Sequence, residues 1–325
     1  MKKKILGLLR ESEGFISGQM ISDKLGVSRT AIWKYINALK EDGYEIESIS
    51  RRGYKIVSSP DILTYEEVEK FLETKYIGRD LVYLSDVDST NNYVKNIAYS
   101  KNEGTVVVAE QQLSGKGRLG RQWTSPSHKG IYMSILLKPS LDPTKVAKLT
   151  LIGAAAVYKA LSDIDIEAKI KWPNDIVISG KKVCGILTEM SCELNIINHI
   201  IMGIGINVNL DDYDIPAELR DKATSLKVLT GNAYNRRELL AIILNHFEKL
   251  YDSFKNDLNL EETINICKEH SAILNKEVQI IQGNNIRTGK AIDINNEGEL
   301  IVEFDNGIET VFSGEISVRG LNGYV

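Results

Sequence analysis

The chain has 325 residues, of which 43% are hydrophobic and 26% are charged, and its formal net charge is −4. This is the composition of an ordinary soluble globular protein, and the length predicts two or three domains. No apolar run approaches the roughly 20 residues that a membrane-spanning helix needs, and no signal-peptide pattern follows the basic N-terminus. The three cysteines lack metal or redox spacing. We therefore expect a cytoplasmic protein with no membrane association.

Residues 1–57 carry an excess of basic side chains on an otherwise acidic chain, which indicates an appended module with an anionic partner. Apolar spacing predicts a short helix that ends at Gly26, a second helix between Ser28 and Gly43, and a two-stranded wing. The second helix would turn small polar and basic side chains outward, as major-groove recognition requires. We predict a winged helix-turn-helix over residues 1–60 that binds DNA; the alternative is a helical hairpin for protein contacts. The predicted DNA-binding residues are Ser28, Arg29, Thr30, Trp33, Lys34, Asn37, Arg51 and Arg52.

Residues 61–271 alternate between apolar runs typical of strands and segments with helical periodicity, which predicts an α+β fold. Ser179-Gly180 is expected to form a tight hairpin turn. The predicted strands are 105–109, 131–137, 166–170, 176–178, 183–190 and 197–208, and the predicted helices are 144–161 and 236–254.

The segment QQLSGKGRLGRQW (111–123) contains glycines at the G-x-G-x-x-G spacing of a dinucleotide-binding turn. That motif needs a helix after the glycines, because the helix N-terminus receives the pyrophosphate. Here another turn and a strand follow, so we reject the dinucleotide interpretation. The glycines and the interleaved cations predict a flexible loop that orders around a phosphate or carboxylate, the alternative being a solvated turn. These cations are Lys116, Arg118 and Arg121.

Four other segments fit the same chemistry. Lys169 and Lys171 lie two apart on a predicted strand, and Asp175 follows in a turn where a carboxylate could face a metal or hydroxyl. Lys182 begins the next strand, and Asn207 is a polar residue in an apolar, glycine-containing run. The segment Asp88–Asn91 suits either a helix N-cap or a neutral polar ligand. The residues alone predict a site for a nucleotide with a metal, beside a small organic ligand that composition and spacing do not identify.

The motifs DSTN (88–91), GKGRLGRQW (115–123), KWPND (171–175), GKKVCGILTE (180–189) and GIGINVN (203–209) occur in this order. Together they resemble those of the biotin protein ligases, and the N-terminal module resembles that of the members that also repress biotin genes. The resemblance implies an α+β protein with three domains: the winged helix, a mixed-sheet catalytic domain (61–271) of the biotin/lipoate-ligase type, and an SH3-like β-barrel (272–325). Short alternating strands with Asn-Glu-Gly and Asp-Asn-Gly turns in the last segment agree with that barrel.

The resemblance also implies the reaction. Biotin would react with MgATP to give biotinyl-5′-AMP, and the acyl group would pass to a lysine of a biotin carboxyl carrier protein. Operator DNA and a homodimer are the other expected partners, with biotinyl-5′-AMP as corepressor; a ligand-independent dimer is the alternative. Two further alternatives are a lipoate-type ligase and a ligand-sensing transcription factor whose ligase site is inactive.

Site residues follow from matching the motifs position by position. Lys182 and Arg118 are the expected catalytic residues, and Asp175 is the expected Mg²⁺ ligand. Two positions depart from the pattern, because Lys116 stands where the family usually has arginine and Leu119 where it often has a basic residue. The expected biotin-binding residues are Ser89, Thr90, Asn91, Gln112, Lys116, Gly117, Arg118 and Lys182. The expected nucleotide-binding residues are Gly115, Arg121, Trp123, Asn174, Asp175, Asn207 and Arg319.

Overall fold

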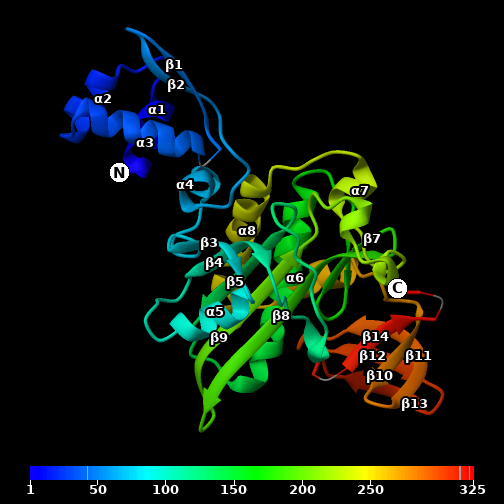
Figure 1. The fold of residues 1–325 in the computed structure, drawn as a ribbon. Helices are drawn as coiled ribbons and strands as arrows, with labels where there is room; N and C mark the ends of the chain where they lie inside the picture. Colours follow the sequence, from blue (N-terminus) through cyan, green and yellow to red (C-terminus); the bar gives the residue numbers. More distant parts are fainter. Residues whose placement is uncertain (42, 315, 322) are drawn as a thin grey trace. The chain divides into compact units, whose positions relative to one another are not determined.

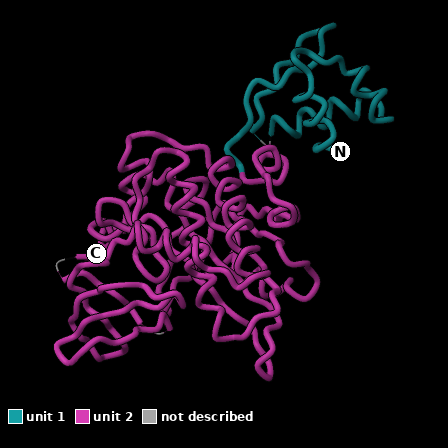
Figure 2. The backbone as a smooth tube through the Cα atoms, turned by 180° about the vertical axis from the view of Figure 1, so that it is seen from behind, with its two compact units in different colours: residues 1–62 teal, residues 63–325 magenta. Residues whose placement is uncertain are grey.

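The computed structural model describes residues 1–325 except 42, 315 and 322. The chain divides into two compact units, residues 1–62 and 63–325 (Figure 2). The division after residue 62 falls close to the domain boundary expected after residue 60. The further boundary expected at 271/272 stays a prediction, because residues 63–325 form one compact unit.

The first unit packs three helices with a two-stranded antiparallel hairpin. Ser28 caps the third helix, because its Oγ accepts a hydrogen bond of 3.2 Å from the amide of Ala31. That helix buries Ile32, Ile36 and Leu39, about one residue per turn. The helix-turn-helix expected from the sequence is confirmed. Its elements are α1 (Lys2–Glu11), α2 (Gly18–Leu25), α3 (Arg29–Glu41), β1 (Glu45–Ile49) and β2 (Gly53–Ser58).

The second unit is built on a seven-stranded sheet in the order β3-β4-β5-β9-β8-β7-β6 (Figure 1). β3 and β4 run parallel, and the other neighbours run antiparallel, so the sheet is mixed as expected. The strands are β3 (Leu81–Val87), β4 (Val106–Gln112), β5 (Ile131–Leu137), β6 (Lys169–Lys171), β7 (Asp175–Ile178), β8 (Lys181–Glu193) and β9 (Ile196–Ile206).

Helices cover both faces of this sheet (Figure 1). Val107 and Leu136 face the small core under α5 (Thr90–Ile97). Their neighbours Val106 and Ile135 point the other way, into the large core formed with α6 (Val146–Ser162), because successive strand residues alternate between faces. Behind α6 lie α8 (Arg236–Asp257) and α9 (Glu261–Glu269). The short elements between are α4 (Tyr65–Val68), α7 (Leu226–Thr230) and the 3-10 turns η1 (Glu69–Phe71), η2 (Arg118–Gly120), η3 (Pro143–Lys145), η4 (Asp212–Asp214) and η5 (Ala217–Leu219).

Several strand predictions were inaccurate at their ends; for example, the strand expected over 105–109 is Val106–Gln112. The strand expected over 166–170 is shorter and later, because only Lys169–Lys171 pair with β7 at the edge of the sheet. The strands expected over 183–190 and 197–208 form one long hairpin, β8–β9. Leu194 and Asn195 make its turn with φ of 49° and 63°, so pairing continues through polar residues to the tip. The turn expected at Ser179-Gly180 is confirmed, with φ of 49° and 77°.

The C-terminal segment forms a five-stranded antiparallel sheet in the order β13-β12-β11-β10-β14. Val278, Ala291, Leu300 and Val302 of this sheet are buried in the same core as α6, so the sheet is continuous with the second unit. Its strands are β10 (Glu277–Gln282), β11 (Asn285–Ile294), β12 (Leu300–Phe304), β13 (Gly307–Val311) and β14 (Ile316–Gly320).

Candidate active site

Two adjoining cavities lie in the second unit, where the glycine-containing loop crosses β8 and β9. The first, of about 40 Å³, lies over the strands and is called the sheet cavity. The second, of about 180 Å³, is rich in basic side chains and is called the cationic cavity. Both are lined by Gly117, Arg118, Trp123, Asn174 and Lys182, so both predicted catalytic residues stand on their common boundary.

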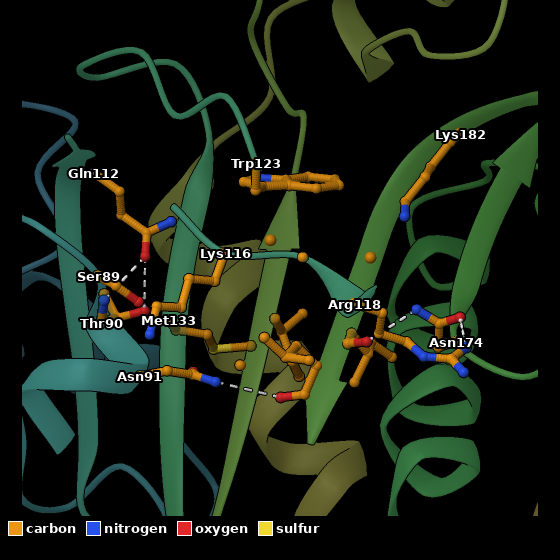
Figure 3. Close-up of a pocket in the computed structure, with 17 residues that line it drawn as sticks. Ser89, Thr90, Asn91, Gln112, Lys116, Arg118, Trp123, Met133, Asn174 and Lys182 are labelled. Carbon is orange, nitrogen blue, oxygen red and sulfur yellow. Dashed lines mark hydrogen bonds between the residues drawn. The ribbon is translucent and has the colours of Figure 1, made fainter. Parts of the chain in front are cut away.

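The side chains of Thr90, Asn91 and Gln112 line the sheet cavity (Figure 3) and belong to a hydrogen-bond network that also includes Ser134 and Glu189, which do not line it. Gln112 Oε1 accepts hydrogen bonds from the Thr90 amide (2.9 Å) and the Thr90 hydroxyl (3.1 Å). Ser134 Oγ lies 2.7 Å from Thr90 Oγ1 and 2.5 Å from Asn91 Oδ1. Asn91 Nδ2 donates to Glu189 Oε2 at 2.6 Å. Because these side chains hydrogen-bond to one another, their orientations are fixed by the protein itself.

Four predicted biotin-binding residues reach this cavity from two places. Ser89, Thr90 and Asn91 are buried at the start of α5, and Gln112 ends β4. Ser134 does not line the cavity but hydrogen-bonds to Thr90 and Asn91; it was not predicted, although a single serine inside the apolar strand YMSILL was a usable signal. The apolar side chains that line the same cavity are Met133, Ile186, Leu187 and Ile204.

Two glycines of β9 let other segments approach the sheet closely. A Cβ at Gly203 would lie 2.3 Å from Asn91 Oδ1, and one at Gly205 would lie 2.6 Å from the Trp123 indole. The first glycine therefore admits the polar side chain and the second admits the aromatic ring. The close backbone approach expected for this run is confirmed.

Lys182, Asp175 and Tyr324 form a coupled group on the cationic side. Lys182 Nζ lies 2.5 Å from Asp175 Oδ1 and 5.2 Å from the centroid of the Trp123 ring. The other oxygen of Asp175 accepts a hydrogen bond from the Tyr324 hydroxyl. Burial alone would raise the pKa of Asp175, but Lys182 and Tyr324 outweigh burial and hold that pKa below its ordinary value. Asp175 is therefore a carboxylate already shared by two partners.

Lys171 is a cation of this cavity that the predicted set of site residues left out. Its Nζ lies 3.4 Å from the centroid of the Tyr324 ring, and the Arg319 guanidinium lies 4.8 Å from the same ring. Burial lowers the pKa of Lys171 to about 7, because the charged form loses water. Lys169 on the same strand is exposed, so the pair of lysines does not act together. Tyr324 was also missed, and no local pattern in the sequence marks it.

Arg118 ties the loop to the C-terminal sheet. Its Nη1 donates to Asn174 Oδ1 at 2.8 Å, and its Nη2 lies 2.7 Å from the carbonyl oxygens of Ser313 and Gly314 and 3.1 Å from that of Ile316. Burial lowers the pKa of this guanidinium, and Asp175 partly offsets the effect. The loop is thus held in place by backbone acceptors of another subdomain.

The two neighbouring cations of the loop are also held. Arg121 Nη2 donates to the Ser317 hydroxyl of the C-terminal sheet at 3.2 Å. Lys116 Nζ donates to Asn92 Oδ1 at 2.7 Å and lines the sheet cavity. Leu119 takes a left-handed conformation, with φ of 56°, and lines the cationic cavity.

Two predicted nucleotide-binding residues lie outside both cavities. Gly115 lines neither, and its carbonyl accepts the Trp123 amide at 2.8 Å, so its role in this structure is in the loop backbone. Asn207 donates from Nδ2 to the Thr224 carbonyl (3.0 Å) and lines a third space of about 50 Å³, called the apolar cavity. The apolar cavity lies against Trp123 and is also lined by Leu210, Ile215, Pro216, Leu219 and Ala223.

The predicted DNA-binding residues of the first unit are on its surface. Arg29, Thr30, Trp33 and Lys34 are exposed on α3, and Asn37 is half-buried. Arg51 and Arg52 are exposed in the β1–β2 turn. The Arg52 guanidinium lies 4.5 Å from the Phe15 ring centroid, which fixes its direction.

The described residues, 1–325 without 42, 315 and 322, contain no group of three or more His, Cys, Asp or Glu side chains that could hold a metal ion. None of the helices in this part of the chain is both long and apolar enough to cross a membrane.

Family comparisons agree along the whole chain. Residues 83–207 match the Biotin/lipoate A/B protein ligase family, residues 2–55 match the HTH domain, and residues 273–319 match the Biotin protein ligase C terminal domain. The Bifunctional ligase/repressor BirA of Bacillus subtilis (strain 168) is 38% identical over 322 residues, which cover 98% of each chain. The protein of the same name from Escherichia coli (strain K12) is 26% identical and covers 97% of this chain and 96% of its own.

A solved structure is similar in fold to the second unit. Biotin protein ligase from Aquifex aeolicus, in complex with biotin and ATP, has a TM-score of 0.66 and 34% identity, and the match covers 74% of this chain and 99% of that one. With the 38% identity along almost the full length, these similarities show which family the chain belongs to. The chain belongs to the biotin protein ligase family, among its bifunctional ligase/repressor members.

Proposed function

We propose that this protein activates biotin with ATP to give biotinyl-5′-AMP and pyrophosphate, and then transfers the biotinyl group to a lysine of a biotin carboxyl carrier protein. The observation that carries the proposal is the shared boundary of a neutral cavity and a cationic one. Lys182 and Arg118 stand on that boundary. A carboxylate held on one side would meet a phosphate held on the other at two cations.

The sheet cavity suits biotin. A ureido ring offers two N–H donors and one carbonyl acceptor, and Thr90, Asn91 and Gln112 supply hydroxyl and amide groups of both kinds. The apolar lining suits the second ring and the carbon chain. The Lys116–Arg118 segment lines the same cavity, where it would close over bound biotin.

The cationic cavity suits the phosphates of ATP, and the apolar cavity suits its adenine. Arg121, Arg319 and Lys171 surround the first space, and Trp123 offers an aromatic face beside Asn207 in the second. Gly115 then acts through the loop backbone. We base the placement of the phosphates and the adenine on the charge and polarity of the residues that line each cavity.

Asp175 fits Mg²⁺ that arrives with the nucleotide. Magnesium commonly binds through one or two carboxylates and substrate phosphates, and Asp175 is one buried carboxylate beside the cationic cavity. The ion would have to share Asp175 with Lys182 or replace the Tyr324 hydroxyl. When bound, it would supply positive charge to the phosphates.

The chemistry then needs charge stabilisation more than proton transfer. A biotin carboxylate oxygen forms a bond to the α-phosphorus as the bond to pyrophosphate breaks, and the carboxylate is already ionised. Lys182 and Arg118 oppose the negative charge where the two anions meet. Enclosure by the loop would protect the mixed anhydride from water. In the second step the acceptor lysine attacks the acyl carbon and AMP leaves.

DNA binding and its control complete the proposal. A single winged helix makes few contacts, so a homodimer that reads two half-sites would bind the operator, with biotinyl-5′-AMP as corepressor. Lys34 and Asn37 would affect operator choice, while Arg51 and Arg52 would contact phosphates. Free cysteines and the use of ATP fit a cytoplasmic location. Deleting residues 1–57 should abolish operator binding, and retained binding would contradict this part.

The deciding experiment is ATP–pyrophosphate exchange with biotin or with lipoate at equal concentration. We expect exchange that depends on biotin. Exchange with lipoate alone would favour the lipoate-type alternative. No exchange, together with biotin-dependent DNA binding, would favour a sensor without ligase activity.

A further inference from the structure

An irregular segment, residues 207–223, walls the cationic and apolar cavities. Leu219 and Ala223 line both cavities, and Leu210 and Ile215 line the apolar one. The later end of this wall is fixed to β8. The Lys182 amide donates to the Lys222 carbonyl at 2.8 Å, and the Thr224 amide donates to the Lys182 carbonyl at 2.9 Å. The strand that carries the proposed catalytic lysine therefore holds one end of the wall.

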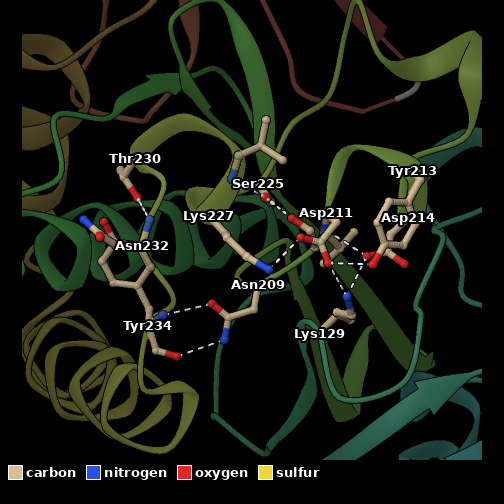
Figure 4. Close-up of polar contacts among 12 residues, drawn as sticks. Lys129, Asn209, Asp211, Tyr213, Asp214, Ser225, Lys227, Thr230, Asn232 and Tyr234 are labelled. Carbon is tan, nitrogen blue, oxygen red and sulfur yellow. Dashed lines mark hydrogen bonds and ion pairs between the residues drawn. The ribbon is translucent and has the colours of Figure 1, made fainter.

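The earlier end of the wall is held by charged side chains (Figure 4). Asp211 Oδ2 lies 2.5 Å from Lys129 Nζ and accepts the Tyr213 hydroxyl at 3.0 Å, while Oδ1 accepts Lys227 Nζ at 2.6 Å. Asp214 Oδ2 lies 3.0 Å from the same Lys129 Nζ and accepts the Asp211 amide at 2.8 Å. We call these five residues the Asp211 cluster.

The Asp211 cluster joins three segments that are separate in sequence. Lys129 ends the connection that carries Trp123, Lys227 lies in α7, and Asp211 lies in the wall. Asn209 adds neutral bonds at the same place. Its amide donates to the Lys129 carbonyl at 2.6 Å, and its side chain makes two hydrogen bonds of 2.9 Å with the backbone of Tyr234. A displacement of the cluster would therefore move the wall relative to Trp123.

A single exposed ion pair stabilises a protein weakly. Here one carboxylate receives two ammonium groups and a hydroxyl, and its side chain is 23% exposed, so the charges act as a network. The cluster lines neither the sheet cavity nor the cationic cavity, apart from Asp214 at the edge of the apolar one. We propose that the Asp211 cluster is a positioning device for the nucleotide: it holds residues 207–223 in the shape that receives ATP and leaves biotin binding alone. This inference rests on the proposed function.

The test replaces the carboxylate at constant size. Asp211→Asn in the full chain should raise the KM for ATP roughly fivefold to tenfold, with the KM for biotin and kcat nearly unchanged. Asp211→Glu should recover part of the ATP affinity. Lys129→Met should resemble Asp211→Asn, and the double variant should be less impaired than the sum of the two, because both disrupt the same network through the shared Lys129–Asp211 ion pair. Asp80→Asn is the matched control. It removes the ion pair between Asp80 and Lys101 (2.9 Å), which lies at the start of β3, whereas the site residues follow the end of that strand.

Two readouts do not depend on catalysis. Calorimetric titration of the full chain with ATP should give weaker binding for Asp211→Asn than for Asp80→Asn. Trypsin should cleave after Arg220 or Lys222 in the wall several-fold faster in Asp211→Asn, because an unanchored loop opens more often. If the wild-type chain lacks biotin-dependent exchange, the proposed function fails while these readouts still judge the cluster. Unchanged ATP affinity overturns the inference, even with faster cleavage, since the cluster would then serve stability alone.

Discussion

The sheet cavity and the cationic cavity share a boundary but are built in different ways. The sheet cavity takes its polar groups from α5 and neighbouring strands, and these groups hydrogen-bond to one another. The cationic cavity collects basic side chains from five segments, around residues 118–121, 171, 182, 222 and 319. Burial lowers the pKa values of Arg118 and Lys171, Asp175 offsets part of that effect, and neighbouring cations lower both values further: Arg121 for Arg118, and Arg319, Lys182 and Arg121 for Lys171. The polar groups of the sheet cavity form hydrogen bonds with one another. The basic side chains of the cationic cavity repel one another, and a bound polyanion would relieve that repulsion.

The largest expected effect comes from removing the charge on the boundary. Lys182→Ala should lower biotin-dependent ATP–pyrophosphate exchange by about 10²–10³-fold, because the developing charge loses a fixed cation. The same change removes the ion-pair partner of the buried Asp175. The free energy of unfolding should therefore fall by up to about 3 kcal/mol. Exchange assays and thermal unfolding measure the two effects. The pair Lys182→Ala and Asp175→Asn should recover stability but not exchange; wild-type exchange in Lys182→Ala would disprove the role.

The next effect concerns the loop between the cavities. Arg118→Gly removes the bonds to Asn174 and to the C-terminal carbonyls, so the loop should release biotinyl-5′-AMP early. We expect biotin on bystander lysines at levels on the order of tenfold above wild type, given the charge-assisted bonds that are lost. Mass spectrometry of a lysine-rich protein mixture measures this. Arg118→Lys, which keeps charge without the planar fork, should be intermediate. Equal bystander labelling by wild type and Arg118→Gly would refute the loop's role.

A smaller effect should appear in the pH dependence of ATP binding. Burial lowers the pKa of Lys171 to about 7, so this lysine is charged below that pH and becomes neutral as the pH rises through it. ATP affinity should therefore fall several-fold as the pH is raised from below to above about 7, while biotin affinity stays level. Lys171→Met should remove this step in a calorimetric titration. A step of the same size in the variant would assign it to another group.

The smallest effect separates the two roles of Tyr324. Tyr324→Phe keeps the ring beneath Lys171 and Arg319 but loses the hydroxyl that binds Asp175, so ATP affinity should change by no more than about threefold. Tyr324→Leu also removes the aromatic face and should weaken ATP binding further. Biotin binding, followed by calorimetric titration, is the control and should not change. Identical ATP affinities for the two variants would mean that the ring contributes nothing.

The sequence predicted the sheet cavity better than the cationic cavity. Apolar periodicity and turn residues predicted the sheet, the helix-turn-helix and the hairpin at Ser179-Gly180, because these depend on neighbours in the chain. Ser89 through Asn91 and Gln112 were predicted by short motifs, and Ser134 was visible as a polar residue in an apolar strand. The contact of Tyr324 with Asp175 joins residues 149 apart, so only the folded chain reveals it. Lys171 and Lys169 look alike in sequence and share the edge strand β6, and only the folded chain shows that Tyr324 packs against Lys171 while Lys169 stays exposed.

The central claim is that one ligand spans both cavities and crosses their boundary at Lys182 and Arg118. The most direct test is a crystal structure of the full chain with a non-hydrolysable analogue of biotinyl-5′-AMP. We expect the ureido ring among Ser89–Asn91 and Gln112, the phosphate within hydrogen-bonding distance of Lys182 or Arg118, and the adenine against Trp123. An analogue bound wholly within one cavity, or a phosphate directed away from both cations, would contradict the account.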